Sequence, residues 1–171
     1  MTPRHDPRVT ADAVDRIVEQ WARERPELDT TAMEVFGRVI RLARVAGDEV
    51  GRMYEQHGIG RPEFDVLATL RRSGSPYQLS PGSLAAAMMM SSGGTTARLD
   101  RLEQRGLVRR SADPDDRLGV TVALTEPGRE LVDAALTAGL GRQQELLAHV
   151  PARQQRQLAE LLRQVLRPLE S

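Results

Sequence analysis

Apolar side chains recur every three or four positions through most of the chain, a spacing typical of amphipathic helices. The first three stripes cover residues 10–24, 29–57 and 61–72, and Arg25-Pro26-Glu27 and Gly58 separate them. Two further helices are expected after residue 125, with Pro151 opening the last one. The pattern therefore predicts a mainly α-helical protein.

Polar residues directly before these stripes predict where the helices begin, because a side-chain oxygen can accept from the free N–H groups of a first turn. We expect Thr10 to cap the first helix, Asp29 or Thr30 the second, and Thr125 the helix that begins at residue 126. Gly139 and Gly141 lie inside that last helix and indicate a bend or a close contact there.

Residues 79–125 depart from this plain helical pattern. Ser80 can cap a short helix that opens with Pro81, where a missing N–H costs nothing. Ser91 or Ser92 can cap a second helix that runs to about residue 105 and ends at Gly106. The two short helices together predict a helix-turn-helix.

Two β-prone runs follow, at residues 107–110 and 119–124, and a turn-rich segment at 111–116 joins them. They predict a two-stranded hairpin, so we expect a winged helix-turn-helix over residues 62–125. The fold class is mainly α with a small β-wing, in a single domain over 1–171. Terminal helical regions at 10–58 and 126–171 flank the motif.

This arrangement suits double-stranded DNA, since the major groove admits a helix whose N-terminal residues reach base edges. Small and hydroxyl-bearing residues open the second helix, and arginines follow that can contact phosphates. The alternative is a solvated helix beside a structural hairpin. The candidate DNA-binding residues are Ser92, Gly93, Gly94, Thr95, Thr96, Arg98, Arg101, Arg109 and Arg117.

Charge alone does not decide between these interpretations. The formal net charge of the chain is zero, and residues 90–117 hold six Arg against five Asp or Glu. The acids Asp113, Asp115 and Asp116 gather at the tip of the wing, where Asp115 can brace Arg117. The order of the charges, rather than their sum, favours DNA binding. All 24 basic side chains are Arg, which a GC-rich coding genome would also produce.

The segment 95–110, together with Asp113-Pro114-Asp115-Asp116-Arg117 and Leu124-Thr125-Glu126-Pro127-Gly128, resembles the MarR family of bacterial transcription regulators. The helical flanks match as well, so the resemblance covers most of the chain. It implies a DNA-binding regulator, a repressor in the usual case, that acts as a homodimer through its N- and C-terminal helices. Two features depart from the family pattern: Gly93-Gly94 at the start of the recognition helix, and Leu118 where another Arg is common.

A more specific resemblance concerns the urate-responsive branch of the family. Trp21, Asp65, Arg98 and Arg110 stand where that branch has the Trp, Asp and two Arg of its ligand pocket. Two guanidinium groups can hold the oxygens of a flat anionic purine, and a carboxylate can accept from its ring N–H. The resemblance implies a small anionic effector such as urate that releases the DNA. Each residue also has a structural explanation: Trp21 as a core anchor, Asp65 as a first-turn acid, and the arginines as phosphate contacts.

Several classes of protein are disfavoured by what the sequence lacks. Without cysteine there can be no disulfide, thiolate zinc site or thiol sensor. The three histidines form no ligand-spaced motif, and no nucleophile and base are paired, so we expect no metal, no cofactor and no enzyme activity. No signal peptide and no membrane-spanning run is evident, which predicts a cytoplasmic protein.

Dimerisation would place paired recognition helices against half-sites about 34–36 Å apart, so a pseudo-palindromic operator is expected. A monomeric bundle is the alternative. Two functional alternatives also remain open: a MarR-like regulator that responds to a phenolic acid or an antibiotic, and a winged-helix protein-interaction module without DNA binding.

Overall fold

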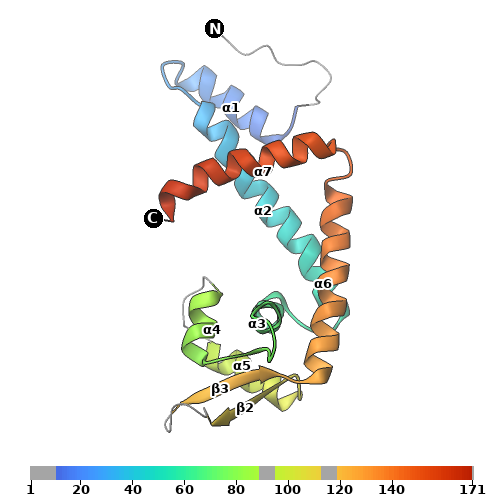
Figure 1. The fold of residues 1–171 in the computed structure, drawn as a ribbon. Coiled ribbons are helices and arrows are strands. Elements are labelled where there is room, and N and C mark those ends of the chain that lie inside the picture. Colours follow the sequence, from blue (N-terminus) through green and yellow to red (C-terminus); the bar gives the residue numbers. More distant parts are fainter. Residues whose placement is uncertain (1–10, 89–94, 113–118, 171) are drawn as a thin grey trace. The chain divides into compact units, whose positions relative to one another are not determined.

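A computed structural model describes residues 11–88, 95–112 and 119–170 of the chain, and most of them are helical (Figure 1). The predicted fold class, mainly α with a small β-wing, is confirmed. The helices are α1 (Ala13–Glu24), α2 (Thr31–Gln56), α3 (Arg61–Arg72), α4 (Pro81–Ala87), α5 (Thr95–Gln104), α6 (Glu126–Leu146), α7 (Ala152–Leu166) and the short 3₁₀ helix η1 (Arg167–Leu169). The strands are β1 (Gln78–Leu79), β2 (Val108–Ala112) and β3 (Val120–Leu124).

The chain divides into two compact units, Met1–Asp48 and Glu49–Ser171. In the first unit, Asp12 rather than Thr10 caps α1, so the predicted cap was wrong. The Asp12 carboxylate accepts from the backbone N of Val14 at 2.6 Å and of Asp15 at 3.0 Å, and Asp15 accepts in return from the Asp12 N at 2.7 Å. In this reciprocal capping box the cap is Asp12, which directly precedes the first helical residue and whose carboxylate is a stronger hydrogen-bond acceptor than a threonine hydroxyl.

An arginine of α2 joins this cap to the second helix. Arg38 donates to Asp12 at 3.0 Å and to Asp15 at 2.5 Å. Nearby, Gly37 faces Val14 so closely that an added Cβ would lie 3.0 Å from Val14 Cγ1. The capping acids and the missing side chain of Gly37 together hold α1 against the first half of α2.

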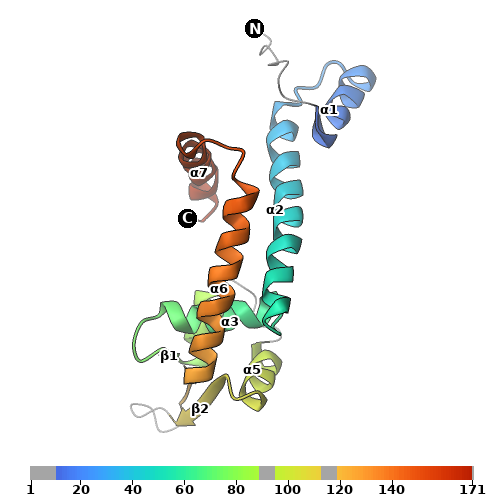
Figure 2. The same ribbon diagram turned by 90° about the vertical axis from the view of Figure 1, so that its right-hand side faces the viewer.

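The second unit contains the winged helix-turn-helix and most of the buried side chains. Helix α3 packs against α6, α4, α5 and β3, and Figure 2 shows α3 lying beside α6. Tyr54 at the end of α2 stacks on Phe64 of α3, with ring centroids 3.9 Å apart. The core also includes Val50, Ile59, Val66, Leu67, Leu70, Leu84, Leu99, Leu102, Leu107, Val108, Val122, Leu124, Val132 and Ala135.

The wing is a three-stranded antiparallel sheet in the order β1-β3-β2, rather than the predicted two-stranded hairpin. Val108 pairs with Leu124, as the two β-prone runs predicted, but the pairing continues to Ala112 with Val120, so Ser111 and Ala112, which were expected in the turn, belong to β2. The third strand, β1, pairs Gln78 with Ala123 and was missed. Two residues are too few to produce an alternating pattern.

Two helices of this unit begin at the predicted capping residues, whereas Ser91 and Ser92, the predicted caps of α5, lie outside the described residues. Ser80 accepts from the Ser83 N at 3.1 Å, and Thr125 accepts from the Gly128 N at 3.1 Å. Gly58 and Gly106 adopt φ values of +72° and +69°, which glycine tolerates without a steric penalty. Within the part of the chain that the structure describes, no helix is long and apolar enough to cross a membrane.

Gly139 provides close packing between α6 and α2. An added Cβ at Gly139 would lie 2.8 Å from Cε1 of Tyr54, whereas nothing lies within 4 Å of one at Gly141. Of the two explanations offered for these glycines, close contact applies to Gly139.

Candidate nucleic-acid interface and ligand site

Helix α5 has one face in the core and another in solvent. Leu99 and Leu102 are buried against the rest of the unit, whereas Thr96 and Arg101 are exposed. Arg109 is exposed on the adjoining strand β2. These three candidate DNA-binding residues therefore remain available to a partner in solution.

The exposed face of α5 is connected to α3 through Glu63. The Glu63 carboxylate lies 3.5 Å from Arg101 Nε and 3.8 Å from Arg105 Nη1, and it also accepts from the Gly60 N at 2.9 Å. One acid thus caps α3 and orients two arginines of α5. Because Arg101 is more than half exposed, this contact leaves its guanidinium accessible to a phosphate.

Arg110, a candidate ligand residue, already has two acidic partners. Its guanidinium lies 2.7 Å from Asp100 Oδ1 and 2.8 Å from Glu103 Oε2, and its backbone N donates to Glu103 at 2.9 Å. These contacts raise the pKa of Arg110, and the hydrogen bond that its guanidinium donates to Asp100 is the largest cause. We call this set of contacts the wing latch, since it fixes the first wing strand to α5.

Asp65 on α3 and Arg98 on α5, two further candidate ligand residues, lie close enough for the charge of Arg98 to act on the Asp65 carboxyl. Burial raises the pKa of the half-buried Asp65 carboxyl, and the positive charges of Arg61 and Arg98 oppose that rise. Nη1 of Arg98 is buried and has no hydrogen-bond partner among the described residues. Arg98 therefore acts electrostatically on Asp65 and keeps one buried donor without a partner in the described part of the chain.

This orientation separates the two roles assigned to Arg98. A phosphate contact needs an exposed guanidinium, whereas an anionic ligand between α3 and α5 needs one turned inward with a donor free. The buried Nη1 favours the ligand role over the DNA role. Thr96, Arg101 and Arg109 are the described DNA-binding candidates whose side chains are exposed to solvent.

For the remaining predicted site residues, the structure describes little or nothing of the side chain's surroundings. Ser92, Gly93, Gly94 and Arg117 lie outside the described residues, and for Thr95 only the helical backbone is described. Trp21 belongs to the unit Met1–Asp48, and its side chain is 44% exposed, so that unit does not bury it as a core anchor.

Four residues that shape this region were not among the predicted site residues: Arg61, Glu63, Asp100 and Glu103. Helical spacing could have suggested Arg61, because it lies four positions before Asp65. The contact of Asp100 and Glu103 with Arg110 depends on how β2 returns along α5, which spacing does not reveal. No cluster of His, Asp or Glu suited to a metal ion occurs within residues 11–88, 95–112 and 119–170.

Comparison with known proteins agrees with this geometry. A model of the MarR family matches residues 59–118. The chain is 35% identical over 152 residues to the HTH-type transcriptional regulator PecS of Dickeya dadantii, which covers 89% of this chain and 92% of that protein.

Solved structures of MarR proteins are similar to this chain as well. A MarR mutant from E. coli in complex with operator DNA matches with a TM-score of 0.67 at 26% identity, over 85% of this chain and 97% of that one. A MarR family regulator from Streptomyces coelicolor in complex with DNA matches with a TM-score of 0.74 at 23% identity, over 84% and 91%. The second likeness concerns the fold alone.

The exposed face of α5, the wing and the extent of the match to PecS lead to one assignment. The interpretation as a regulator rather than an enzyme is confirmed with it. The chain belongs to the MarR family of DNA-binding transcriptional regulators.

Proposed function

We propose that this regulator represses its target genes as a homodimer on a pseudo-palindromic operator, and that a small aromatic anion such as urate releases it. The observation that carries the ligand part is the Asp65 and Arg98 pair: a half-buried carboxylate beside a guanidinium whose Nη1 has no partner among the described residues. Buried donors are nearly always satisfied, so an unsatisfied one indicates a place for an acceptor.

The chemistry of a urate-like anion suits this pair. A carboxylate accepts from a ring N–H, while a guanidinium donates to carbonyl oxygens in a planar, bidentate geometry. Trp21 and Arg110 remain predictions from the family resemblance. For Arg110, ligand binding would have to compete with the wing latch to Asp100 and Glu103.

The proposed release mechanism is thermodynamic linkage. If a ligand holds Arg98 toward α3 and draws Arg110 away from α5, the recognition helix and wing shift relative to the groove. The effect on DNA affinity equals the difference in ligand affinity between the two states, typically about 1–3 kcal/mol.

The test is a titration of the promoter region of the protein's own gene, with and without urate, at one fixed salt concentration because DNA affinity depends on salt. Binding that urate weakens by about fivefold or more supports the proposal. Binding that urate leaves unchanged removes urate and directs the search to other aromatic anions such as phenolic acids. Absence of DNA binding would support the protein-interaction module.

Two variants test the separate roles of Arg98 and Asp65 in ligand response and DNA binding. Arg98→Ala is expected to abolish the response to urate, and Asp65→Ala to weaken the response while sparing DNA affinity. A response retained in Arg98→Ala would remove Arg98 from the ligand site. A large loss of DNA binding by a folded Asp65→Ala protein would contradict the location of Asp65 away from the DNA.

A further inference from the structure

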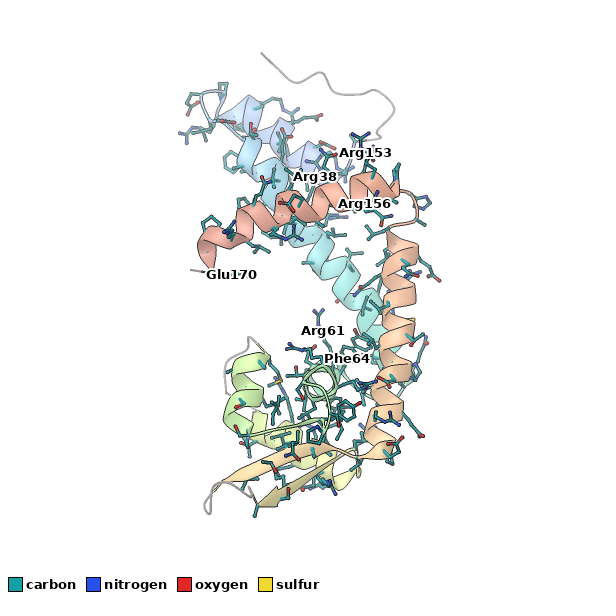
Figure 3. The ribbon with its side chains drawn as sticks, viewed as in Figure 1. Arg38, Arg61, Phe64, Arg153, Arg156 and Glu170 are labelled. Atoms are coloured by element: carbon teal, nitrogen blue, oxygen red, sulfur yellow. The ribbon has the colours of Figure 1, made fainter. Side chains whose placement is uncertain are left out.

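Arg61 is a positively charged residue next to the proposed ligand site that belongs to none of the predicted sets. It is the first residue of α3 and precedes Asp65 by four positions, so the two side chains share one face of the helix. In Figure 3 the Arg61 side chain extends from α3 away from the wing, whereas Phe64 lies on the inner side of the helix. Arg61 is exposed at the edge of the region where Asp65 is half buried.

The pairing of the neighbouring arginines sets Arg61 and Arg98 apart. Arg71 is bound to Asp133, Arg101 to Glu63, and Arg110 to both Asp100 and Glu103. Arg61 and Arg98 form no ion pair with any acid in the described ranges. Both instead act on one acid, Asp65, so the three side chains carry a local net charge of +1.

The electrostatic effect of Arg61 reaches beyond Asp65. Burial raises the pKa of the Tyr54 hydroxyl, Arg61 opposes that rise, and Asp65 adds to it. Arg61 therefore lies within range of both the Tyr54 hydroxyl and the Asp65 carboxylate. The positive charges of Arg61, on α3, and Arg98, on α5, thus act on the same carboxylate from two different helices.

We propose that Arg61 is a specificity-determining contact of the ligand site, in which Arg61 and Arg98 flank Asp65 and select an aromatic anion over its neutral analogue. This inference rests on the proposed ligand function. Asp65 accepts a ring N–H from either kind of ligand, and its own negative charge disfavours the anion, so a preference for the anion has to come from the neighbouring positive charges. A second guanidinium gives the site an excess positive charge, which favours the anion through a charge-assisted hydrogen bond.

The experiment measures direct binding of two purines to the full-length protein by isothermal titration calorimetry near neutral pH. Urate is the anionic probe, and hypoxanthine is the neutral one. The wild-type protein is expected to prefer urate. In Arg61→Gln, the affinity for urate falls by about 3- to 10-fold while that for hypoxanthine changes little.

Two further variants control for charge and structure. Arg61→Lys keeps the positive charge and should retain most of the preference for urate. Arg129→Gln removes one positive charge from the exposed start of α6, where Arg129 pairs with Glu126, and should leave the preference unchanged. Thermal melts of all variants confirm that each is folded.

The ratio of the two affinities decides the inference. If Arg61→Gln keeps the wild-type ratio, or loses affinity for both purines equally, Arg61 does not determine specificity and only the proposed ligand function stands. The same holds if the wild-type protein binds hypoxanthine as tightly as urate. If the wild-type protein binds neither purine, the inference about Arg61 is overturned together with urate as the effector, whereas the proposed homodimer on its operator still stands.

Discussion

At the scale of single residues, Gly128 has less room for a side chain than the other glycines whose surroundings the structure describes. An added Cβ would lie 1.9 Å from the carbonyl O of Leu107 and 2.9 Å from its carbonyl C, and these are backbone atoms fixed by the start of β2. Leu107 O also accepts from the Thr125 N at 3.2 Å. We expect Gly128→Ala to lower the free energy of unfolding by about 2–4 kcal/mol, measured by urea denaturation.

A matched control lies in the same helix. Gly141 has nothing within 4 Å of an added Cβ, so Gly141→Ala should raise the free energy of unfolding by about 0.5–1 kcal/mol through the better helix propensity of Ala. If both variants changed stability alike, the close approach of α6 to Leu107 would be wrong.

Asp65 gives the second prediction at this scale, because folding raises the pKa of its carboxyl. A carboxyl with a raised pKa binds its proton more tightly in the folded state. Its stabilising contribution is therefore present below the unfolded-state pKa and is lost as the pH rises through the folded-state pKa. At neutral pH the ionised Asp65 costs stability, and Asp65→Asn should melt higher than the wild type, by about 1–2 °C.

The pH dependence tests the cause. The difference in melting temperature between Asp65→Asn and the wild type should shrink as the pH falls below the ordinary range of an Asp carboxyl, where the wild-type group is protonated in both states. A difference that is the same at neutral and acid pH would point to packing rather than charge. The same variant should also bind urate less tightly, since an amide cannot replace a carboxylate as an acceptor for ring N–H groups on both oxygens.

At the scale of secondary-structure elements, the wing latch couples β2 to α5. Arg110 is partly exposed, so its pairs with Asp100 and Glu103 are discounted for solvent screening. A double-mutant cycle of Arg110→Gln and Glu103→Gln should give a coupling energy of about 0.5–1 kcal/mol in urea denaturation. A coupling near zero would mean that the wing is held by its backbone contacts alone.

Much of the element layout could be predicted from the sequence, because it depends on local rules. Helical spacing located α2 and α3, and the capping residues Ser80 and Thr125 and the turn glycine Gly106 marked helix ends. Strand β1 could not be predicted, because its two residues become a strand only by pairing with β3.

The candidate site was predictable only in part for the same reason. Family resemblance supplied Asp65, Arg98 and Arg110, and helical periodicity placed Asp65 on α3. Neither showed that Arg110 is held by Asp100 and Glu103, or that Nη1 of Arg98 is buried without a described partner. Such contacts join residues through the tertiary fold, so spacing along the chain does not encode them.

At the scale of the whole molecule, apolar side chains remain exposed on helices outside the winged core. Helix α7 has no buried residue, although one face of it is apolar. In the unit Met1–Asp48, Phe36 and Ile40 of α2 are likewise exposed. A monomer seldom leaves so many large apolar side chains in water, so these faces support the proposed homodimer. On α7 and η1 the exposed members are Leu158, Leu161, Val165, Leu166 and Leu169.

The dimer leads to a prediction that joins assembly to DNA binding. Leu161→Glu puts a charge in the middle of the apolar face of α7, where burial against a second copy would be costly. Arg156→Gln makes the same change in net charge, but on the opposite, polar face by helical spacing. Light scattering should show a dimer for the wild type and for Arg156→Gln, and a monomer for Leu161→Glu.

The loss of the dimer should also weaken DNA binding. Because one recognition helix reaches only one half-site, the monomer should lose most of its operator affinity, while the melting temperature of its winged core stays unchanged. If Leu161→Glu remains dimeric and binds the operator normally, the C-terminal helix does not form the interface.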